Sequence, residues 1–286
     1  MSRGLAKEWP LIGFTLLTQT AVGAFWTLAA AEAIFASEGR VFLDGPALLV
    51  ILVLGGAGTL LSLFHLGKPS RAVNALANLR ASWLSREILA DLAFLGAGAA
   101  LWLLAALDKT EDSLRTILII LGAAAGFFLI FTMSRLYMLR TVPVWRGAHT
   151  PVSFFLSAVF LGPLLAAILT PAFDEMGSAA RWIFAAIALV ASSLTFVAMA
   201  LCTPSVGLLV RTRPTLLAYP RTKIMGHLAA RAGFLVAATA CFLLFLLRSP
   251  DSSPAPLSLV AGSFAALSSE IIGRSLFYAM YSRIGV

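Results

Sequence analysis

Two acidic side chains stand at the start of a long apolar segment of this chain. Glu87 and Asp91 are four residues apart, so they share one face of a predicted helix, and Arg86 precedes them. Ionisable groups within a membrane segment are costly, and they usually face a cavity, a partner or a proton route. A contact with the positive N-terminal end of the helix is the alternative interpretation. Asp91 is one turn deeper and is therefore the stronger indication of a functional site.

The connection before these acids is polar for a link between two apolar segments. Between His65 and Glu87 it contains four basic residues. Apolar residues recur at helical spacing within 69–84, which predicts a helix lying along the membrane interface. The polar face of this helix is suited to a pocket mouth, to a partner protein, or to contact with lipid headgroups alone.

Apolar segments long enough to cross a bilayer recur along the whole chain. Of the 286 residues, 60% are apolar and only 12% are charged, and the mean hydropathy is +0.93. We predict an all-α polytopic membrane protein, because a lipid-exposed backbone must satisfy its own hydrogen bonds and the alternating pattern of a spanning barrel is absent. The single predicted domain, 1–286, has eight transmembrane helices, at about 10–35, 45–66, 86–107, 114–138, 151–170, 180–204, 228–248 and 256–281.

Basic residues are concentrated on one side of this predicted topology. The two termini and the 67–86, 135–150 and 205–231 connections hold 16 of the 21 lysines and arginines. The positive-inside rule therefore predicts that both the N and C termini are cytoplasmic. The basic composition then reports topology, and it does not indicate binding to nucleic acid.

The cysteines and histidines restrict which redox centres this protein can hold. Cys202 and Cys241 both fall within predicted spans, and two thiols cannot supply the four ligands of an iron–sulfur cluster. His65, His149 and His227 all stand at span ends on the basic side, so no histidine pair can ligate a haem deep in the bundle. We expect no intrinsic haem, cluster or metal site.

Glu270, Arg274 and Glu32 are further charged residues within predicted spans. Glu270 and Arg274 are four residues apart in the last span, in the order that favours an ion pair along the helix. Glu32, late in the first span, has no obvious partner. We expect it at the interface, and the far end of a proton route is the alternative.

Five motifs occur in the order typical of one family. They are Glu8-Trp9-Pro10-Leu11, His65-Leu66-Gly67-x-Pro69-x-Arg71-Ala72, Ser82-Trp83-Leu84-Ser85-Arg86-Glu87, Thr141-Val142-Pro143-x-Trp145 and Glu270-x-Ile272-Gly273-Arg274-x-x-Phe277-Tyr278. With these motifs the chain resembles the DmsC family over essentially its whole length. Members of that family are eight-helix membrane anchors of dimethyl sulfoxide reductase and related molybdenum enzymes.

The resemblance implies a non-catalytic subunit in the bacterial inner membrane that binds a quinone, either menaquinone or ubiquinone. It also implies two partners: an iron–sulfur subunit, and a catalytic subunit that holds the molybdopterin. In the family, the residues aligned with His65 and Glu87 are associated with quinol binding and oxidation. We expect His65 to hydrogen-bond a quinone oxygen, Glu87 to exchange a proton and Asp91 to act as a relay, although a cap on the second span is the simpler role for His65. Weaker candidates for shaping the pocket are Arg71, Arg86 and Tyr137.

Alternatives are open for the side of the membrane that the catalytic subunits face and for the class of protein. The charge bias favours an inward-facing complex like the membrane-bound sulfite dehydrogenases, against an outward-facing dimethyl sulfoxide reductase that oxidises menaquinol. A proton-coupled transporter would also contain membrane acids, but neither an internal repeat nor paired Gly/Pro breaks are recognisable. A purely structural anchor without a quinone is the third interpretation.

Overall fold

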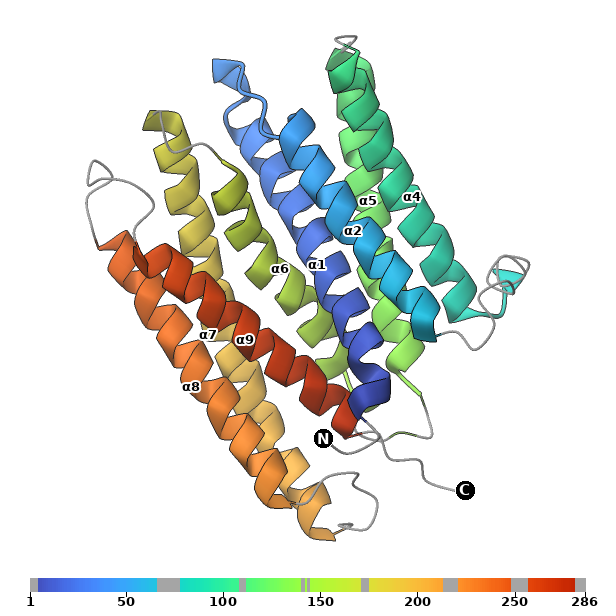
Figure 1. The fold of residues 1–286 in the computed structure, drawn as a ribbon, viewed down its shortest axis with the longest axis vertical. Helices are drawn as coiled ribbons and strands as arrows, with labels where there is room; N and C mark the ends of the chain where they lie inside the picture. Colours follow the sequence, from blue (N-terminus) through green and yellow to red (C-terminus); the bar gives the residue numbers. More distant parts are fainter. Residues whose placement is uncertain are drawn as a thin grey trace.

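The computed structural model describes residues 5–65, 78–107, 112–139, 142, 145–170, 175–212, 221–247 and 257–280. This part of the chain is helical (Figure 1). The helices are α1 (Leu5–Ile34), α2 (Gly45–His65), α4 (Trp83–Ala106), α5 (Asp112–Tyr137), α6 (His149–Leu169), α7 (Glu175–Thr212), α8 (Arg221–Leu246) and α9 (Leu257–Ala279), with the short 3-10 helix η1 (Ala36–Glu38).

Seven of these eight α-helices are long and apolar enough to cross a membrane; α9 is the exception within the described residues. α9 is less apolar because it carries Glu270, Arg274 and several serines. The predicted all-helical membrane architecture is confirmed, whereas the count of eight spans and the side of the termini stay predictions. α7 exceeds its predicted span: its 38 residues correspond to about 57 Å of helix, longer than the roughly 30 Å hydrocarbon core.

The predicted interfacial helix at 69–84 lies mostly outside the described residues, because 66–77 are not described, and it stays a prediction. Residues 79–81, just before α4, form a turn. Ser82 is the N-cap of α4, since its hydroxyl oxygen accepts a hydrogen bond from the Ser85 amide at 3.2 Å.

α1 is the central helix of the bundle. It packs against α2 and α6 along its length and also contacts α5 and α9. In α1, 67% of the membrane-spanning window is buried within the protein, against 22% in α8. Figure 1 shows α4 and α5 on one side of α1 and α7 and α8 on the other, with α9 passing across the bundle.

The backbones of α1 and α6 touch where two glycines meet. A methyl group on Gly23 would overlap the carbonyl oxygen of Ala158, and one on Gly162 would overlap the backbone of Gly23. Small residues at such a crossing let membrane helices approach closely, and van der Waals contact then stabilises the pair. No larger residue fits at either position without separating α1 from α6.

We expect Gly162→Ala to destabilise the protein by about 1–3 kcal/mol, because the added methyl forces two backbones apart. Thermal unfolding of the detergent-solubilised protein measures this loss. Gly96→Ala in α4 is the matched control, since a methyl there meets nothing within 4 Å. Equal stability of the two variants would contradict the close crossing.

Candidate functional site

The two acids identified in the sequence lie on the buried face of α4. Glu87 is 5% exposed and Asp91 is 4% exposed, and both share a stripe at helical spacing with Phe94 and Leu101. The opposite face, with Leu89 and other exposed apolar residues, is directed outward. The amphipathic pattern of α4 therefore turns both carboxylates into the bundle.

Each buried carboxylate has an oxygen without a hydrogen-bond partner among the described residues. Thr59 of α2 donates to Oδ2 of Asp91 at 2.6 Å, which fixes that side chain. Oδ1 of Asp91 and Oε2 of Glu87 are buried and unpaired. Leaving a buried polar atom unpaired is unfavourable, so these oxygens are well placed to exchange a proton or a hydrogen bond with a ligand.

The predicted pocket residue Tyr137 belongs to the same cluster. It is the last residue of α5, it is 8% exposed, and its hydroxyl accepts a hydrogen bond from the Tyr278 hydroxyl at 2.9 Å. Glu87 interacts electrostatically with Asp91 and with both tyrosines. The structure thus brings together three of the predicted site residues and adds Tyr278 from α9.

Arg86 does not join this cluster. Its Nε donates to the carbonyl of Leu79 at 2.9 Å and its Nη2 to the carbonyl of Arg80 at 2.8 Å. The guanidinium lies 4.3 Å from the centre of the Trp83 ring, which Arg135 of α5 also approaches, at 5.2 Å. Arg86 therefore stabilises the turn before α4.

The remaining predicted residues are only partly described. His65 is the last residue of α2, and its side chain lies outside the described part of the structure, as does Arg71. α2 and α4 pack side by side, and the end of α2 lies at the same end of the bundle as the start of α4 (Figure 1). The backbone position of His65 is therefore at the same end of the bundle as Glu87.

A second buried polar network joins α1, α6 and α9. Nη2 of Arg274 donates to Oε1 of Gln19 at 2.9 Å and to the Ser157 hydroxyl at 3.1 Å. The same guanidinium lies 3.9 Å from the centre of the Phe154 ring. Arg274 also interacts electrostatically with Tyr137 and with the other tyrosine of the cluster, so this network borders the carboxylate cluster.

The predicted ion pair between Glu270 and Arg274 is wrong. Glu270 is instead paired with Arg231 of α8 at 3.2 Å, and it accepts a hydrogen bond from Ser157 at 2.5 Å. Gly273 makes the pairing with Arg231 possible, because a methyl group at that position would overlap the Arg231 guanidinium. Packing between helices has overridden the local spacing rule.

The cluster offers hydrogen-bonding groups beside aromatic rings. No group of three or more His, Cys, Asp or Glu side chains converges among the residues described, and both cysteines are free. The carboxylates supply unpaired oxygens and the tyrosines supply hydroxyls, while four aromatic rings pack around Tyr137. Hydrogen-bonding groups beside aromatic rings can hold a quinone head group.

The family model of the DMSO reductase anchor subunit (DmsC) matches residues 1–280. The chain belongs to the DmsC family. It is 32% identical over 287 residues to anaerobic dimethyl sulfoxide reductase chain YnfH of Escherichia coli, covering 98% of this chain and 96% of the relative. A second E. coli relative, also a chain of an anaerobic dimethyl sulfoxide reductase, is 32% identical over 286 residues, with the same coverage. A sulfite dehydrogenase subunit of Allochromatium vinosum is 31% identical over 150 residues, or 49% of this chain and 46% of that subunit.

The resemblance predicted from the motifs is thereby confirmed. This DmsC-family chain is a multi-pass membrane anchor subunit of the dimethyl sulfoxide reductase type. Its relatives are subunits of multisubunit complexes that include a sulfite dehydrogenase.

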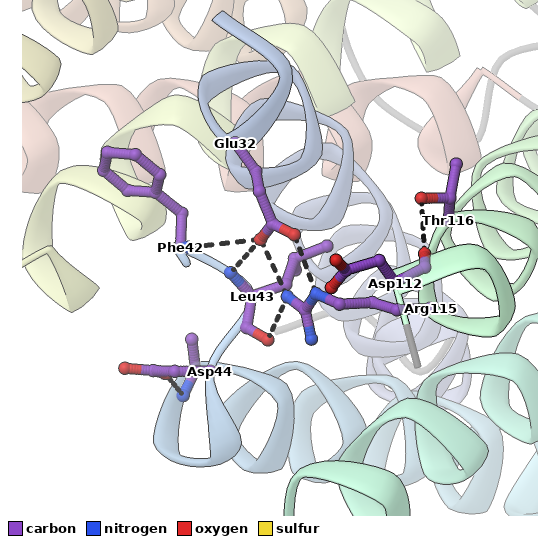
Figure 2. Close-up of polar contacts among 8 residues, drawn as sticks. Glu32, Phe42, Leu43, Asp44, Asp112, Arg115 and Thr116 are labelled. Atoms are coloured by element: carbon purple, nitrogen blue, oxygen red, sulfur yellow. Dashed lines mark hydrogen bonds and ion pairs between the residues drawn. The ribbon is translucent and has the colours of Figure 1, made fainter. Parts of the chain in front are cut away.

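At the opposite end of the bundle, the DmsC-family chain has a closed ion pair (Figure 2). Nε and Nη2 of Arg115 each donate to one oxygen of Glu32 at 2.8 Å. The carboxylate also accepts hydrogen bonds from the amides of Phe42 and Leu43, at 3.2 and 3.1 Å. The partner of Glu32 was not recognisable in the sequence, and this bidentate pair ties α1 to α5.

Three residues of the site were not identified from the sequence: Thr59, Tyr278 and Arg231. Tyr278 stands within a quoted motif, but its partner is 141 residues away. A threonine in an apolar helix usually bonds its own backbone, as Thr59 also does, so nothing local marks it as a partner of Asp91.

We expect Arg115→Ala to lower the stability of the protein by about 3 kcal/mol, because it leaves the Glu32 carboxylate unpaired. This is the low end for a buried pair, since the Glu32 side chain keeps 16% exposure. Thermal unfolding measures the loss, with the exposed Glu38→Gln as a control that removes a charge nearby. Stability equal to the control would contradict a structural role for the pair.

Proposed function

We propose that this protein binds a quinone at the end of the bundle formed by the start of α4 and the ends of α5 and α9. It would then pass electrons between the membrane quinone pool and an iron–sulfur partner subunit of a molybdopterin oxidoreductase complex in the bacterial inner membrane. The observation that supports this most directly is the pair of buried carboxylates with unpaired oxygens beside two tyrosine hydroxyls.

The residues of the cluster have complementary roles in this proposal. A bound quinone supplies two-electron chemistry that is coupled to two protons. Glu87 exchanges a proton through its unpaired Oε2, and Asp91, held by Thr59, relays it. His65 is proposed to hydrogen-bond one quinone oxygen, and Arg71 to shape the mouth of the site.

The electrons have to reach a redox centre in another chain. Two cysteines cannot ligate a cluster, and the three histidines all stand near the ends of apolar segments. We therefore assign the iron–sulfur clusters and the molybdopterin to partner subunits, of which the iron–sulfur subunit docks near the quinone site. Lipids surround the remaining apolar surface.

For the direction of the complex we favour an inward-facing arrangement of the sulfite dehydrogenase type. It is supported by the bias of basic residues toward the end that carries Glu87. The alternative is an outward-facing reductase that oxidises menaquinol, and it is supported by the two relatives that cover 98% of the chain and are dimethyl sulfoxide reductase chains.

In the purified complex, we expect Glu87→Gln to reduce quinone-coupled turnover by at least about tenfold, because the amide cannot exchange the proton. Turnover with an artificial dye that reacts at the partner subunits should not change. Glu38→Gln, at an exposed acid near the opposite end of the bundle, is the control. Full quinone turnover by an assembled Glu87→Gln complex would refute the site and leave a structural anchor.

Topology has its own test. A fluorescent protein fused to the C-terminus should fold and fluoresce in the cytoplasm, whereas alkaline phosphatase at the same point should stay inactive, because the positive-inside rule places both termini inside. The same reporters inserted after residue 109, in the opposite connection, should give the reverse pattern. An active phosphatase at the C-terminus would favour the outward-facing alternative.

A further inference from the structure

Resting on the proposed quinone function, we propose that Tyr278 is a positioning residue for the quinone site. It holds the Tyr137 hydroxyl in place so that this hydroxyl donates a hydrogen bond to a quinone oxygen. Tyr278 is on α9, so this role links the last helix to the site on α4 and α5.

The hydrogen-bond arrangement of the two phenols supports this assignment. A phenol has one hydrogen to donate and also accepts. Tyr278 donates to Tyr137 at 2.9 Å, and both residues are buried. The Tyr137 hydroxyl therefore accepts a hydrogen bond from α9 and keeps its own hydrogen for another acceptor. Tyr137 also interacts electrostatically with Glu87.

Aromatic packing prevents the Tyr137 ring from turning away. Four rings surround it with centroid separations of 5.5 to 5.7 Å, contributed by Trp145, Phe154, Phe277 and Tyr278. Trp145 is itself fixed, since its indole nitrogen donates to the Phe277 carbonyl at 2.9 Å. With the ring held in place, the bond from Tyr278 decides where the Tyr137 hydrogen points.

A buried cation stands behind the two phenols. Arg274 bonds to the neutral oxygens of Gln19 and Ser157. It also interacts electrostatically with Glu270, whose ion-pair partner is Arg231. The guanidinium of Arg274 interacts electrostatically with both tyrosine hydroxyls, and a positive charge favours phenol oxygens that are turned toward it.

The test compares Tyr278→Phe, Tyr137→Phe and the double variant in the complete complex. The two readouts are the binding of a short-chain naphthoquinone, by isothermal titration calorimetry, and KM and kcat for quinone. Each single variant should weaken binding and raise KM roughly three- to tenfold, the loss expected for one neutral hydrogen bond. Because Tyr278 acts through Tyr137, the double variant should be no weaker than Tyr137→Phe alone.

Ser192→Ala is the matched control. It removes a hydroxyl–hydroxyl hydrogen bond between α7 and α8, from Ser192 to Thr239, and this bond has the same length of 2.9 Å as the tyrosine pair. Its quinone affinity should equal that of the wild type. Wild-type affinity in either tyrosine variant, or losses that simply multiply in the double variant, would overturn the role of Tyr278. If Glu87→Gln retained full quinone turnover, the proposed function itself would fail, whatever the tyrosine variants show.

Discussion

The backbone contact between α1 and α6 at Gly23 and Gly162 fixes the distance between these two helices. Gly23 lies one turn from Gln19 on α1, and Gly162 lies just over a turn from Ser157 on α6. The separation fixed by the two glycines therefore also fixes the separation of Gln19 and Ser157, the two oxygens that share the guanidinium of Arg274. A change in that crossing would move the cation and, with it, the setting of the tyrosine pair.

The acidic side chains within the bundle differ in how completely their oxygens are paired. Glu32 is enclosed by a bidentate arginine and two backbone amides, and Glu270 by Arg231 and Ser157. Glu87 and Asp91 have no such enclosure, since each keeps a buried oxygen unpaired among the described residues. Unpaired polar groups are costly within a membrane. A fully paired carboxylate there stabilises the fold, whereas a carboxylate with an unpaired oxygen is typical of a functional site.

Local patterns in the sequence predicted the helices and the face of α4 that carries both acids, because hydrophobic spacing and side-chain direction are set within a few residues. Pairing between distant helices was not predictable. Glu32 and Arg115 are 83 residues apart, and Arg274 and Gln19 are 255 apart. For Glu270 the local spacing rule even predicted the wrong arginine, because the rule assumes a helix in isolation while Gly273 admits Arg231 from a neighbour. The partners of Arg86 were not predictable for a similar reason: its two carbonyl acceptors belong to a turn that no periodicity indicated.

The start of α4 at Trp83 also has an electrical consequence. Asp91 lies eight residues into this helix, which corresponds to about 12 Å along its axis, or about two-fifths of a hydrocarbon core of roughly 30 Å. A proton that enters from that end to reach Asp91 would cross only this fraction of the transmembrane voltage, which amounts to about 1 kcal/mol for every 100 mV. With the hydrocarbon core taken to begin at Trp83, the transmembrane voltage would therefore have only a small effect on the ionisation of Asp91.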